Sequence, residues 1–352
     1  MSQTMSAYRM LQWQQPPQLM EVEVPEPGPD EILVRVAGNG LCHSDLHMMH
    51  MPGQLGPTLG WQMPFTLGHE TAGWIERWGS RVTGLQQGQA VALVSPTSCG
   101  SCHECLSGHD NVCGHNGVGR GFGFDGGLAE FVLVRDKRSL IALEGLEPLT
   151  AGPLTDAGAT SWHGFNRIRP QLLPGANVLV IGAGGLGSFA VQYIKLLTQA
   201  RLIVADIASN KLEHARSLGA DICVDSSAVD LGREVMQLTE GQGVVAVLDF
   251  VGNEQTIAAG IAVLGKLGSY GLVGGEMGGY PQPLFHALAS KEAQIFSFMG
   301  PTIADTQAVL ALAAEGALVN EVEVFELADV GEAYRRLGAG ELTARAVIRT
   351  SG

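Results

Sequence analysis

Residues 178–187 read Val-Leu-Val-Ile-Gly-Ala-Gly-Gly-Leu-Gly, and a helical pattern of apolar residues continues to Leu197. An apolar strand, the motif G-x-G-x-x-G and a helix follow one another here. This is the context in which the glycine motif binds a dinucleotide. Gly182 permits the tight turn, Gly184 lets the backbone approach a pyrophosphate, and Gly187 lets helix and strand pack closely. The stretch therefore predicts a dinucleotide site. A glycine-rich turn that binds nothing is the alternative.

The chain beyond this motif alternates apolar strands with helical segments, which predicts βαβ units in a parallel sheet. The further strand patterns lie at 202–205, 244–248 and 268–273. Asp206 ends the strand that follows the motif, where its carboxylate would accept the two adenosine ribose hydroxyls and repel a 2′-phosphate. No arginine follows in 207–210 to neutralise a phosphate, although Lys211 lies near. NAD is therefore favoured over NADP.

Four cysteines crowd one loop, in the sequence C-G-S-C-H-E-C-L-S-G-H-D-N-V-C. They are Cys99, Cys102, Cys105 and Cys113. This C-x2-C-x2-C-x7-C spacing lets one loop surround a tetrahedral zinc ion with four thiolates. Disulfides between residues three apart would be strained, and unbonded thiols that merely lie close are the remaining alternative. Because cysteines fill all four positions, the sequence predicts a structural zinc with no place for water.

The composition limits the class of protein. The chain has 352 residues, long enough for two domains, and its 35 acidic against 21 basic residues give a net charge of -14. This balance disfavours nucleic acid and anionic membranes as partners. No apolar run approaches the roughly 18 residues of a membrane span, and the N-terminus shows no secretory signal pattern. We therefore expect a cytoplasmic protein with no membrane partner.

The first 150 or so residues differ in texture from the rest. Residues 20–24 and 31–36 alternate between apolar and polar side chains, as half-solvated antiparallel strands do, and prolines separate them. We therefore expect a mainly β region ahead of the βαβ units.

Three residues far apart in this chain suggest a second metal site, although their spacing alone cannot connect them. Cys42 lies in G-L-C-H-S-D-L-H, His69 in L-G-H-E and Asp156 in P-L-T-D-A-G-A-T. With the cysteine loop and G-A-G-G-L-G, the chain resembles the zinc-dependent medium-chain alcohol dehydrogenases over essentially its full length. The resemblance implies an α/β protein. A GroES-like mainly β catalytic domain (1–152 and 300–352) would carry the zinc lobe, and a Rossmann doubly wound parallel sheet (153–299) would bind the cofactor.

The resemblance also implies roles for residues around the second metal. Cys42, His69 and Asp156 match the catalytic zinc ligands, and Glu70 matches a neighbouring acid that can approach the metal. In having aspartate as the third ligand, the chain resembles bacterial secondary-alcohol dehydrogenases. An aspartate ligand would leave the metal harder and more Lewis-acidic than a cysteine ligand would. Asp45 matches the carboxylate that orients the histidine ligand.

The remaining carried-over roles concern the proton and the cofactor. Ser44 and His47 match the hydroxyl and the surface base of a proton relay. Arg345 resembles a pyrophosphate-binding arginine, with an ordinary surface arginine as the alternative. The predicted cofactor contacts are Gly182, Gly184, Gly185, Leu186, Gly187, Asp206, Lys211, Phe250, Val273 and Arg345.

We therefore expect reversible hydride transfer between NAD and a secondary, hydrophobic alcohol or its ketone. Two zinc ions would be bound per chain, one catalytic and one structural, in a homodimer or homotetramer. Two alternatives stay open: a polyol or sugar-alcohol dehydrogenase of the same fold, and a dinucleotide-binding protein without catalysis. The aromatics Trp61, Phe65 and Trp162 and the loop 117–124 could line an apolar pocket or be ordinary packing. Arg120, expected to be exposed in that loop, does not by itself indicate an anionic substrate.

Overall fold

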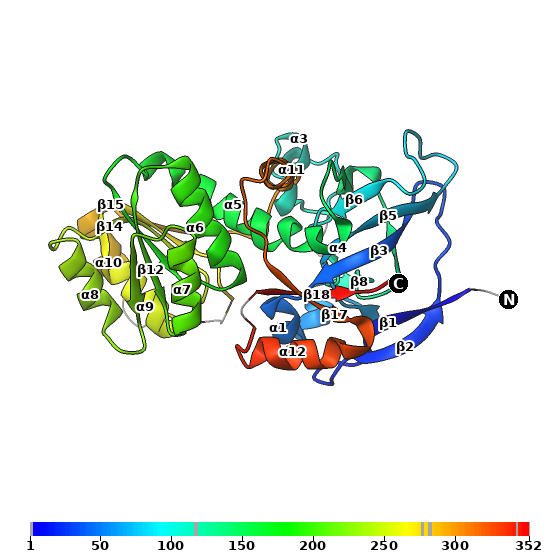
Figure 1. The fold of residues 1–352 in the computed structure, drawn as a ribbon, viewed down its shortest axis with the longest axis horizontal. Helices are drawn as coiled ribbons and strands as arrows, with labels where there is room; N and C mark the ends of the chain where they lie inside the picture. Colours follow the sequence, from blue (N-terminus) through cyan, green and yellow to red (C-terminus); the bar gives the residue numbers. More distant parts are fainter. Residues whose placement is uncertain (1–2, 116–118, 276–277, 281–283, 343, 352) are drawn as a thin grey trace. The chain divides into compact units, whose positions relative to one another are not determined.

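The computed structural model describes residues 3–115, 119–275, 278–280, 284–342 and 344–351. It divides into two compact units. Unit 1 comprises Met1–Ala159 and Gly300–Gly352, and unit 2 comprises Thr160–Met299 (Figure 1). Helix α5 (Ala157–Ile168) contains the boundary between Ala159 and Thr160.

Unit 1 is built around β-sheets, as the sequence predicted. Its largest sheet has the order β10-β6-β5-β3-β18-β17 among the described residues, with β9 also pairing β3. A smaller sheet has the order β2-β1-β4, and β7 pairs β8. The strands are β1 (Thr4–Met10), β2 (Gln18–Glu23), β3 (Ile32–Gly40), β4 (Phe65–Thr66), β5 (Glu70–Trp78), β6 (Ala90–Leu93), β7 (Gly119–Arg120), β8 (Gly123–Phe124), β9 (Phe131–Val134), β10 (Leu140–Ala142), β17 (Val322–Glu326) and β18 (Arg345–Arg349).

Short helices connect these strands, and two longer ones come from the C-terminal part of the chain. Helices α1 and α12 lie in contact although they stem from opposite ends of the sequence (Figure 1). The helices are α1 (His43–His50), α2 (Leu55–Thr58), α3 (His103–Leu106), α4 (Pro148–Ala151), α11 (Ile303–Ala314) and α12 (Val330–Gly338). The 3-10 turns are η1 (Asp110–Val112), η2 (Lys137–Ser139), η3 (Gly152–Thr155) and η6 (Leu327–Asp329).

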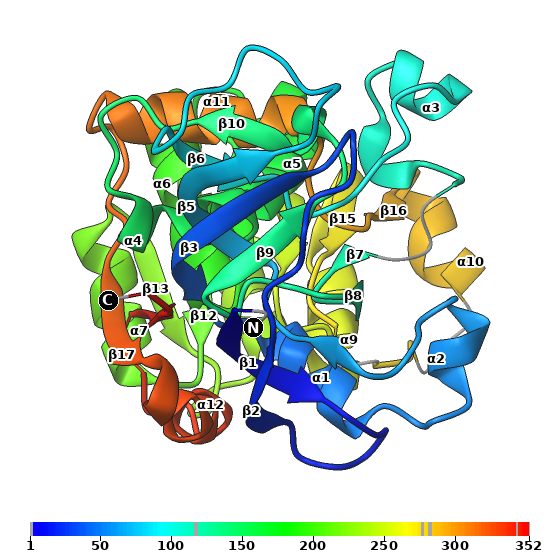
Figure 2. The same ribbon diagram turned by 90° about the vertical axis from the view of Figure 1, so that its right-hand side faces the viewer.

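Strand β3 is antiparallel to its neighbours β5, β9 and β18, but the prediction that it is half-solvated is wrong. Ile32 and Val34 face a core with Ile75, while Leu33 faces a second core with Met5. Figure 2 shows β3, β5 and β6 running side by side in unit 1. Because both faces are covered, the strand is buried up to its C-terminal end, which lies shortly before Cys42.

Unit 2 contains a sheet of order β13-β12-β11-β14-β15-β16 among the described residues, and every pairing in it is parallel. This is the doubly wound order in which ligands bind at the carboxyl ends of the strands where the order reverses. The parallel βαβ prediction is confirmed. The strands are β11 (Asn177–Ile181), β12 (Arg201–Asp206), β13 (Ile222–Asp225), β14 (Val244–Asp249), β15 (Leu264–Leu272) and β16 (Gln294–Ser297).

The helices of unit 2 bury the apolar strands. Leu179 and Ile203 point into a core that also contains Val235 of α8 and Ile257 of α9. The helices are α6 (Gly185–Leu197), α7 (Ser209–Ser217), α8 (Leu231–Leu238), α9 (Glu254–Ala262) and α10 (Leu284–Leu288), with 3-10 turns η4 (Arg169–Gln171) and η5 (Ala289–Lys291). Among the described residues, no helix combines the length and the hydropathy that a bilayer span demands.

Candidate active site

Four potential metal ligands of unit 1 converge, although the sequence separates them widely. Cys42 precedes α1, His69 and Glu70 stand at the start of β5, and Asp156 follows η3. Their ligand atoms all lie within 4.8 Å of one another. A thiol, an imidazole and carboxylates are the donors that zinc accepts in proteins. The donor set therefore fits the catalytic zinc that the sequence predicted.

The surroundings of His69 favour a positive charge in this cluster. The ring is 1% exposed, and its Nε2 lies 3.6 Å from Oδ2 of Asp156 and 3.4 Å from Oγ of Ser44. Its Nδ1 lies 3.3 Å from Oδ1 of Asp45. Burial lowers the pKa of His69, but the carboxylates of Asp45 and Asp156 outweigh burial and raise it well above its usual range. Since a metal ion can replace that proton at Nε2, the electrostatics also fit zinc.

Asp45 is fixed in place by two donors. It is fully buried, and its Oδ2 accepts hydrogen bonds from the Cys42 backbone N–H at 3.1 Å and from the Tyr334 hydroxyl at 3.0 Å. The other oxygen faces His69. Sequence reasoning missed Tyr334, which lies on α12; its only signal was the apolar face of that helix, shared with Val330 and Leu337.

Glu70 and Arg345 form a buried ion pair. Arg345 Nε lies 3.0 Å from Oε2 of Glu70, and a second guanidinium nitrogen bonds Oε1. The residues are 0% and 8% exposed, respectively. Burial raises the pKa of Glu70, and the Arg345 charge opposes that rise. The structure therefore gives Arg345 a partner that the sequence did not indicate, and the alternative of an ordinary surface arginine is wrong. Its contact with a pyrophosphate stays a prediction.

The expected proton relay lies on α1. Ser44 and His47 are three positions apart in this helix, so they share a face. Ser44 is partly buried beside His69, whereas His47 is exposed to solvent. This placement suits a path from the cluster to water, and the roles of the two residues stay predictions.

The cysteine loop has the dimensions of a zinc site. The sulfur atoms of Cys99 and Cys105 lie 4.0 Å apart, and those of Cys102 and Cys113 lie 3.8 Å apart. Four thiolates about 2.3 Å from one zinc would be about 3.8 Å from each other. All six cysteines of the chain are free thiols, so the disulfide alternative is not what the structure shows. Four closely spaced free thiols therefore fit the structural zinc that the sequence predicted.

The glycine motif of unit 2 has the geometry that its pattern predicted. Gly182 has a φ of +87°, which favours glycine, and a Cβ on Gly187 would collide with the Gly182 carbonyl oxygen. A Cβ on Gly184, in contrast, would meet no atom within 4 Å. Gly184 therefore borders open space at the N-terminus of α6, where Gly185 and Leu186 form the first turn. A phosphate fits such a position.

Asp206 stands at the end of β12, next to this loop. Its Oδ2 accepts a hydrogen bond from Ala183 N–H at 2.8 Å, and its Oδ1 accepts one from Ala208 N–H at 2.9 Å. Lys211 lies in the first turn of the following helix, α7. The carboxylate is thus already oriented by the backbone, and it is 8% exposed.

Phe250 and Val273 follow the next two strands of the sheet. Phe250 N–H donates to Ile181 O at 2.9 Å, and Val273 N–H donates to Asp249 O at 2.9 Å. The Phe250 side chain lies 3.5 Å from where a Cβ of Gly182 would be. Both predicted contacts therefore belong to loops at the edge of the sheet that carries the glycine motif. Sequence reasoning missed Asp249, which joins these loops.

Aromatic rings line one side of the metal-binding cluster. The Phe122 ring centroid lies 4.6 Å from that of His69, and Trp61 lies 5.8 Å from Phe122. Trp61 also contacts Phe65 and stacks on Trp13, which sequence reasoning missed. These contacts make an apolar wall beside His69.

Two further sequence expectations have different outcomes. Trp162 packs in unit 2 against Tyr193 and Phe165, so its ring is part of ordinary packing. Arg120 is only 3% exposed, and the expectation of an exposed arginine is wrong. It donates to Val94 O at 2.6 Å, and burial lowers its pKa to about 10, so it stays charged at neutral pH. Residues 117 and 118 of the predicted pocket loop lie outside the described residues.

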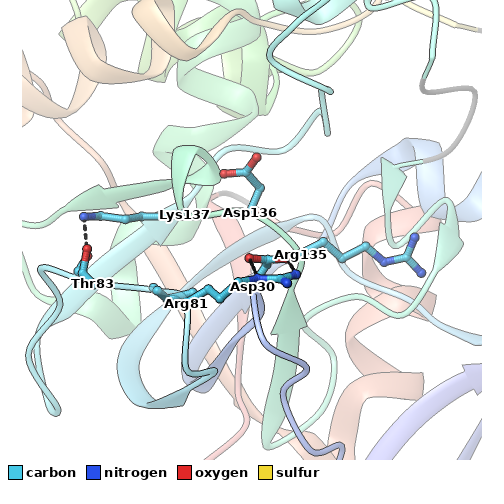
Figure 3. Close-up of a pocket in the computed structure, with 7 residues that line it drawn as sticks. Asp30, Arg81, Thr83, Arg135, Asp136 and Lys137 are labelled. Carbon is cyan, nitrogen blue, oxygen red and sulfur yellow. Dashed lines mark hydrogen bonds and ion pairs between the residues drawn. The ribbon is translucent and has the colours of Figure 1, made fainter.

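A polar pocket elsewhere on unit 1 is not part of this site. Figure 3 shows Asp30 bonded to Arg81 and Lys137 donating to the Thr83 carbonyl group, with Asp136 nearby. Because these charged groups already have partners within the protein, the pocket does not indicate a ligand.

Comparison with known proteins agrees with this geometry. Residues 28–145 match the family described as alcohol dehydrogenase GroES-like domain, and residues 185–315 match the one described as zinc-binding dehydrogenase. An NAD-dependent alcohol dehydrogenase of Sulfurisphaera tokodaii is 32% identical, with 98% of this chain and 99% of that protein covered. D-arabinose 1-dehydrogenase (NADP(+)) of Saccharolobus solfataricus is 30% identical, with 95% and 94% covered.

A solved structure is also similar over the whole chain. The crystal structure of the alcohol dehydrogenase from Aeropyrum pernix superposes with a TM-score of 0.92 at 34% identity, and 98% of this chain and 99% of that chain are covered. The chain therefore belongs to the zinc-dependent medium-chain alcohol dehydrogenase family.

Proposed function

We propose that this protein, a zinc- and NAD-dependent alcohol dehydrogenase, acts on secondary, hydrophobic alcohols and their ketones. The observation that carries the proposal is the convergence of Cys42, His69, Glu70 and Asp156 in unit 1. The four-cysteine loop would hold a second, structural zinc. Unit 1 would be the catalytic domain and unit 2 the cofactor domain.

The protein residues would hold the metal and move the proton. Cys42, His69 and Asp156 would bind zinc, which when bound lowers the pKa of an alcohol oxygen and polarises a carbonyl group, while NAD accepts the hydride. Ser44 Oγ, which lies 3.4 Å from His69 Nε2, would accept the proton of the alcohol as it gives up its own hydroxyl proton. His47 on the exposed face of α1 would release it to solvent.

The rings beside His69 support the proposed substrate class. Phe122 and Trp61 offer apolar surface and supply no carboxylate or amide to bind several hydroxyl groups. Burying a hydrocarbon group against such rings is favourable by about 25 cal/mol per Å². This supports a hydrophobic alcohol.

The preference for NAD rests on Asp206. Its carboxylate is held at the end of β12 by the N–H groups of Ala183 and Ala208. A 2′-phosphate would meet this fixed negative charge, whereas ribose hydroxyls would donate to it.

A polyol or sugar dehydrogenase is the second candidate, because a relative that covers nearly the whole chain is named D-arabinose 1-dehydrogenase. A dinucleotide-binding protein without catalysis would need no convergent ligand set, so the metal-binding cluster disfavours it.

We also propose a homodimer or homotetramer located in the cytoplasm. In the part of the chain that the structure describes, β16 pairs only with β15, so one edge of this strand is open. Apolar side chains lie near it in sequence, with Met299 81% and Phe285 74% exposed. An open edge with apolar neighbours is suited to association with another copy. Light scattering on the purified protein would test the oligomeric state.

The decisive experiment is a substrate survey. Purified protein with NAD would be given primary, secondary, cyclic and polyhydroxy alcohols, and NADH formation measured. We expect the highest kcat/KM for secondary or cyclic hydrophobic alcohols, loss of activity with a zinc chelator, and recovery with added zinc. Highest activity with polyols would favour the second candidate, and no NAD reduction with any alcohol would contradict the proposal.

A further inference from the structure

Asp249 occupies the central point of the sheet in unit 2. It is the last residue of β14, it is fully buried, and it pairs in register with Ile181 of β11 on one side and Leu272 of β15 on the other. The strand order reverses between β11 and β14. Crevices at such reversals are where doubly wound sheets bind their ligands.

The Asp249 side chain and backbone together hold two loops. Oδ1 accepts hydrogen bonds from Val251 N–H at 2.8 Å and Gly252 N–H at 3.0 Å, which fixes the loop after β14. The Asp249 carbonyl oxygen accepts from the N–H groups of Val273 and Gly274, both at 2.9 Å, which fixes the loop after β15. One residue therefore sets the path of both loops.

These loops carry Phe250 and Val273, the proposed cofactor contacts that directly follow β14 and β15. The loops touch: a Cβ on Gly274 would collide with the backbone of Phe250 and Val251. Phe250 also lies 3.6 Å from the Cβ position of Gly187. A shift of either loop would consequently move the wall that faces the glycine motif.

Tyr270 fixes the orientation of the Asp249 carboxylate. Its hydroxyl donates to Oδ2 of Asp249 at 2.6 Å, and its ring is 1% exposed and packs against Gly260 of α9. Burial and the Asp249 charge both raise the pKa of Tyr270, so the phenol keeps its proton. With Tyr270 on one oxygen and two N–H groups on the other, the carboxylate cannot rotate without losing a bond.

We propose that Asp249 and Tyr270 are positioning residues for the nicotinamide cofactor, which act by holding the loops of Phe250 and Val273. This inference rests on the proposed function, since it needs NAD to bind at these loops. It predicts that loss of the Tyr270 hydroxyl weakens cofactor binding without affecting either zinc site, because both zinc sites lie in unit 1.

The test compares Tyr270→Phe, Asp249→Asn and Asp249→Ala with wild type. The matched control is Tyr193→Phe, the same change at a fully buried tyrosine of unit 2 that lies in the middle of α6. NADH affinity would be measured by fluorescence titration, together with zinc content, unfolding temperature, and KM for NAD against kcat.

We expect Tyr270→Phe to raise the NADH Kd and the KM for NAD by about 5- to 20-fold, with zinc content and kcat close to wild type. Asp249→Ala should raise them further, while Asp249→Asn should restore much of the affinity because an amide oxygen still accepts from Val251 and Gly252. Tyr193→Phe should leave the NADH Kd unchanged. If Asp249→Ala does not fold, the NADH Kd of Tyr270→Phe still tests the inference.

Two results would overturn the inference. If Tyr270→Phe lowers the unfolding temperature but leaves the NADH Kd within twofold of wild type, the pair has only a structural role. If wild type itself binds no NADH, the proposed function fails and this inference fails with it. If wild type binds NADH and the variants have unchanged NADH Kd values, the inference fails but the proposed function stands.

Discussion

The Tyr334 hydroxyl donates a hydrogen bond to Oδ2 of Asp45 at 3.0 Å, although 289 positions separate the two residues. The other oxygen of Asp45 lies 3.3 Å from His69 Nδ1, so α12 is linked through one carboxylate to a proposed zinc ligand. A carboxylate that orients a ligating histidine raises the basicity of that histidine. Tyr334 in turn limits how far the carboxylate can move.

Replacing Tyr334 with phenylalanine should therefore weaken the catalytic zinc site. We expect the zinc Kd of that site to rise about 3- to 10-fold, somewhat less than the effect of losing a group in direct contact with a ligand. Chelator competition would measure it. Tyr8→Phe is the control, because the Tyr8 ring stacks on Tyr334 in the same core. Equal zinc affinity in the two variants would count against this role of Tyr334.

The two proposed zinc ions should have separable roles. Cys42→Ala and Asp156→Ala remove ligands of the cluster and should abolish turnover while most of the protein stays folded, with about one zinc left per chain. Cys102→Ala should reduce the yield of soluble protein, because a structural zinc contributes directly to folding. Metal analysis and circular dichroism would check both. Active wild type that contains a single zinc per chain would contradict the scheme.

Asp206 should control the choice between NAD and NADP. Asp206→Ala should weaken NAD binding by about 2–4 kcal/mol, the loss of two charge-assisted hydrogen bonds, and narrow the gap to NADP. Asp206→Asn is the matched variant, because it removes the charge but keeps an acceptor for one of the N–H groups of Ala183 and Ala208. The measurement is kcat/KM with each cofactor. Equal use of both cofactors by wild type would refute this role.

His47 should affect proton release during alcohol oxidation and should not affect the binding of zinc or NAD. His47→Gln should keep zinc and NAD affinity but slow alcohol oxidation, most clearly at low pH, with partial rescue by small buffers that act as bases. The exposed position of His47 three residues after Ser44 is the reason. pH-rate profiles of the variant and wild type would be compared. Superimposable profiles would exclude His47 from the relay.

Asp221 should give unit 2 a pH-dependent part of its stability. Burial opposes its ionisation, but the Leu202 N–H at 2.7 Å and the Lys195 ammonium group at 2.8 Å outweigh burial and lower its pKa. Because the folded pKa is lower than the unfolded value near 3.9, this stabilisation is present above about pH 4 and is lost as pH falls further. The carboxylate is 38% exposed, so solvent screening limits the effect to about 0.5 kcal/mol.

Urea unfolding of wild type and Asp221→Asn would measure this contribution. The difference in unfolding free energy should be present at neutral pH and shrink toward zero in acid. Lys195→Met should cost a similar amount, and the double variant little more, since both single changes break one interaction. A difference that grows as pH falls would have the wrong sign for this explanation.

The features that could be predicted from sequence are those whose parts lie close along the chain. The glycine motif, its helix and the strand before it occupy twenty consecutive residues, 178–197, and the structure reproduces them as β11 and α6. The four cysteines likewise lie in one loop. In both cases local geometry is enough to bring the functional groups together, so spacing alone carries the information.

The missed features depend on contacts between distant segments. Arg345 pairs with Glu70 because β18 lies beside β3 in the sheet, and no periodicity in the sequence predicts this strand pairing. Arg120 was expected to be exposed because glycines surround it, yet the fold buries its side chain. Asp249 directly follows the strand pattern predicted at 244–248, and its importance is visible only from the two loops that it joins.

The discontinuity of unit 1 has a consequence for the order of events during synthesis. Unit 2 is one continuous stretch, Thr160–Met299, whereas the groups that hold Asp45 and Glu70 come from the last stretch of the chain. Since domains generally fold as units while the ribosome is still at work, the cofactor-binding sheet can form first. The centre for catalysis must wait for Tyr334 and Arg345 to emerge. A nascent chain would thus acquire a place for its coenzyme before it could turn over any substrate.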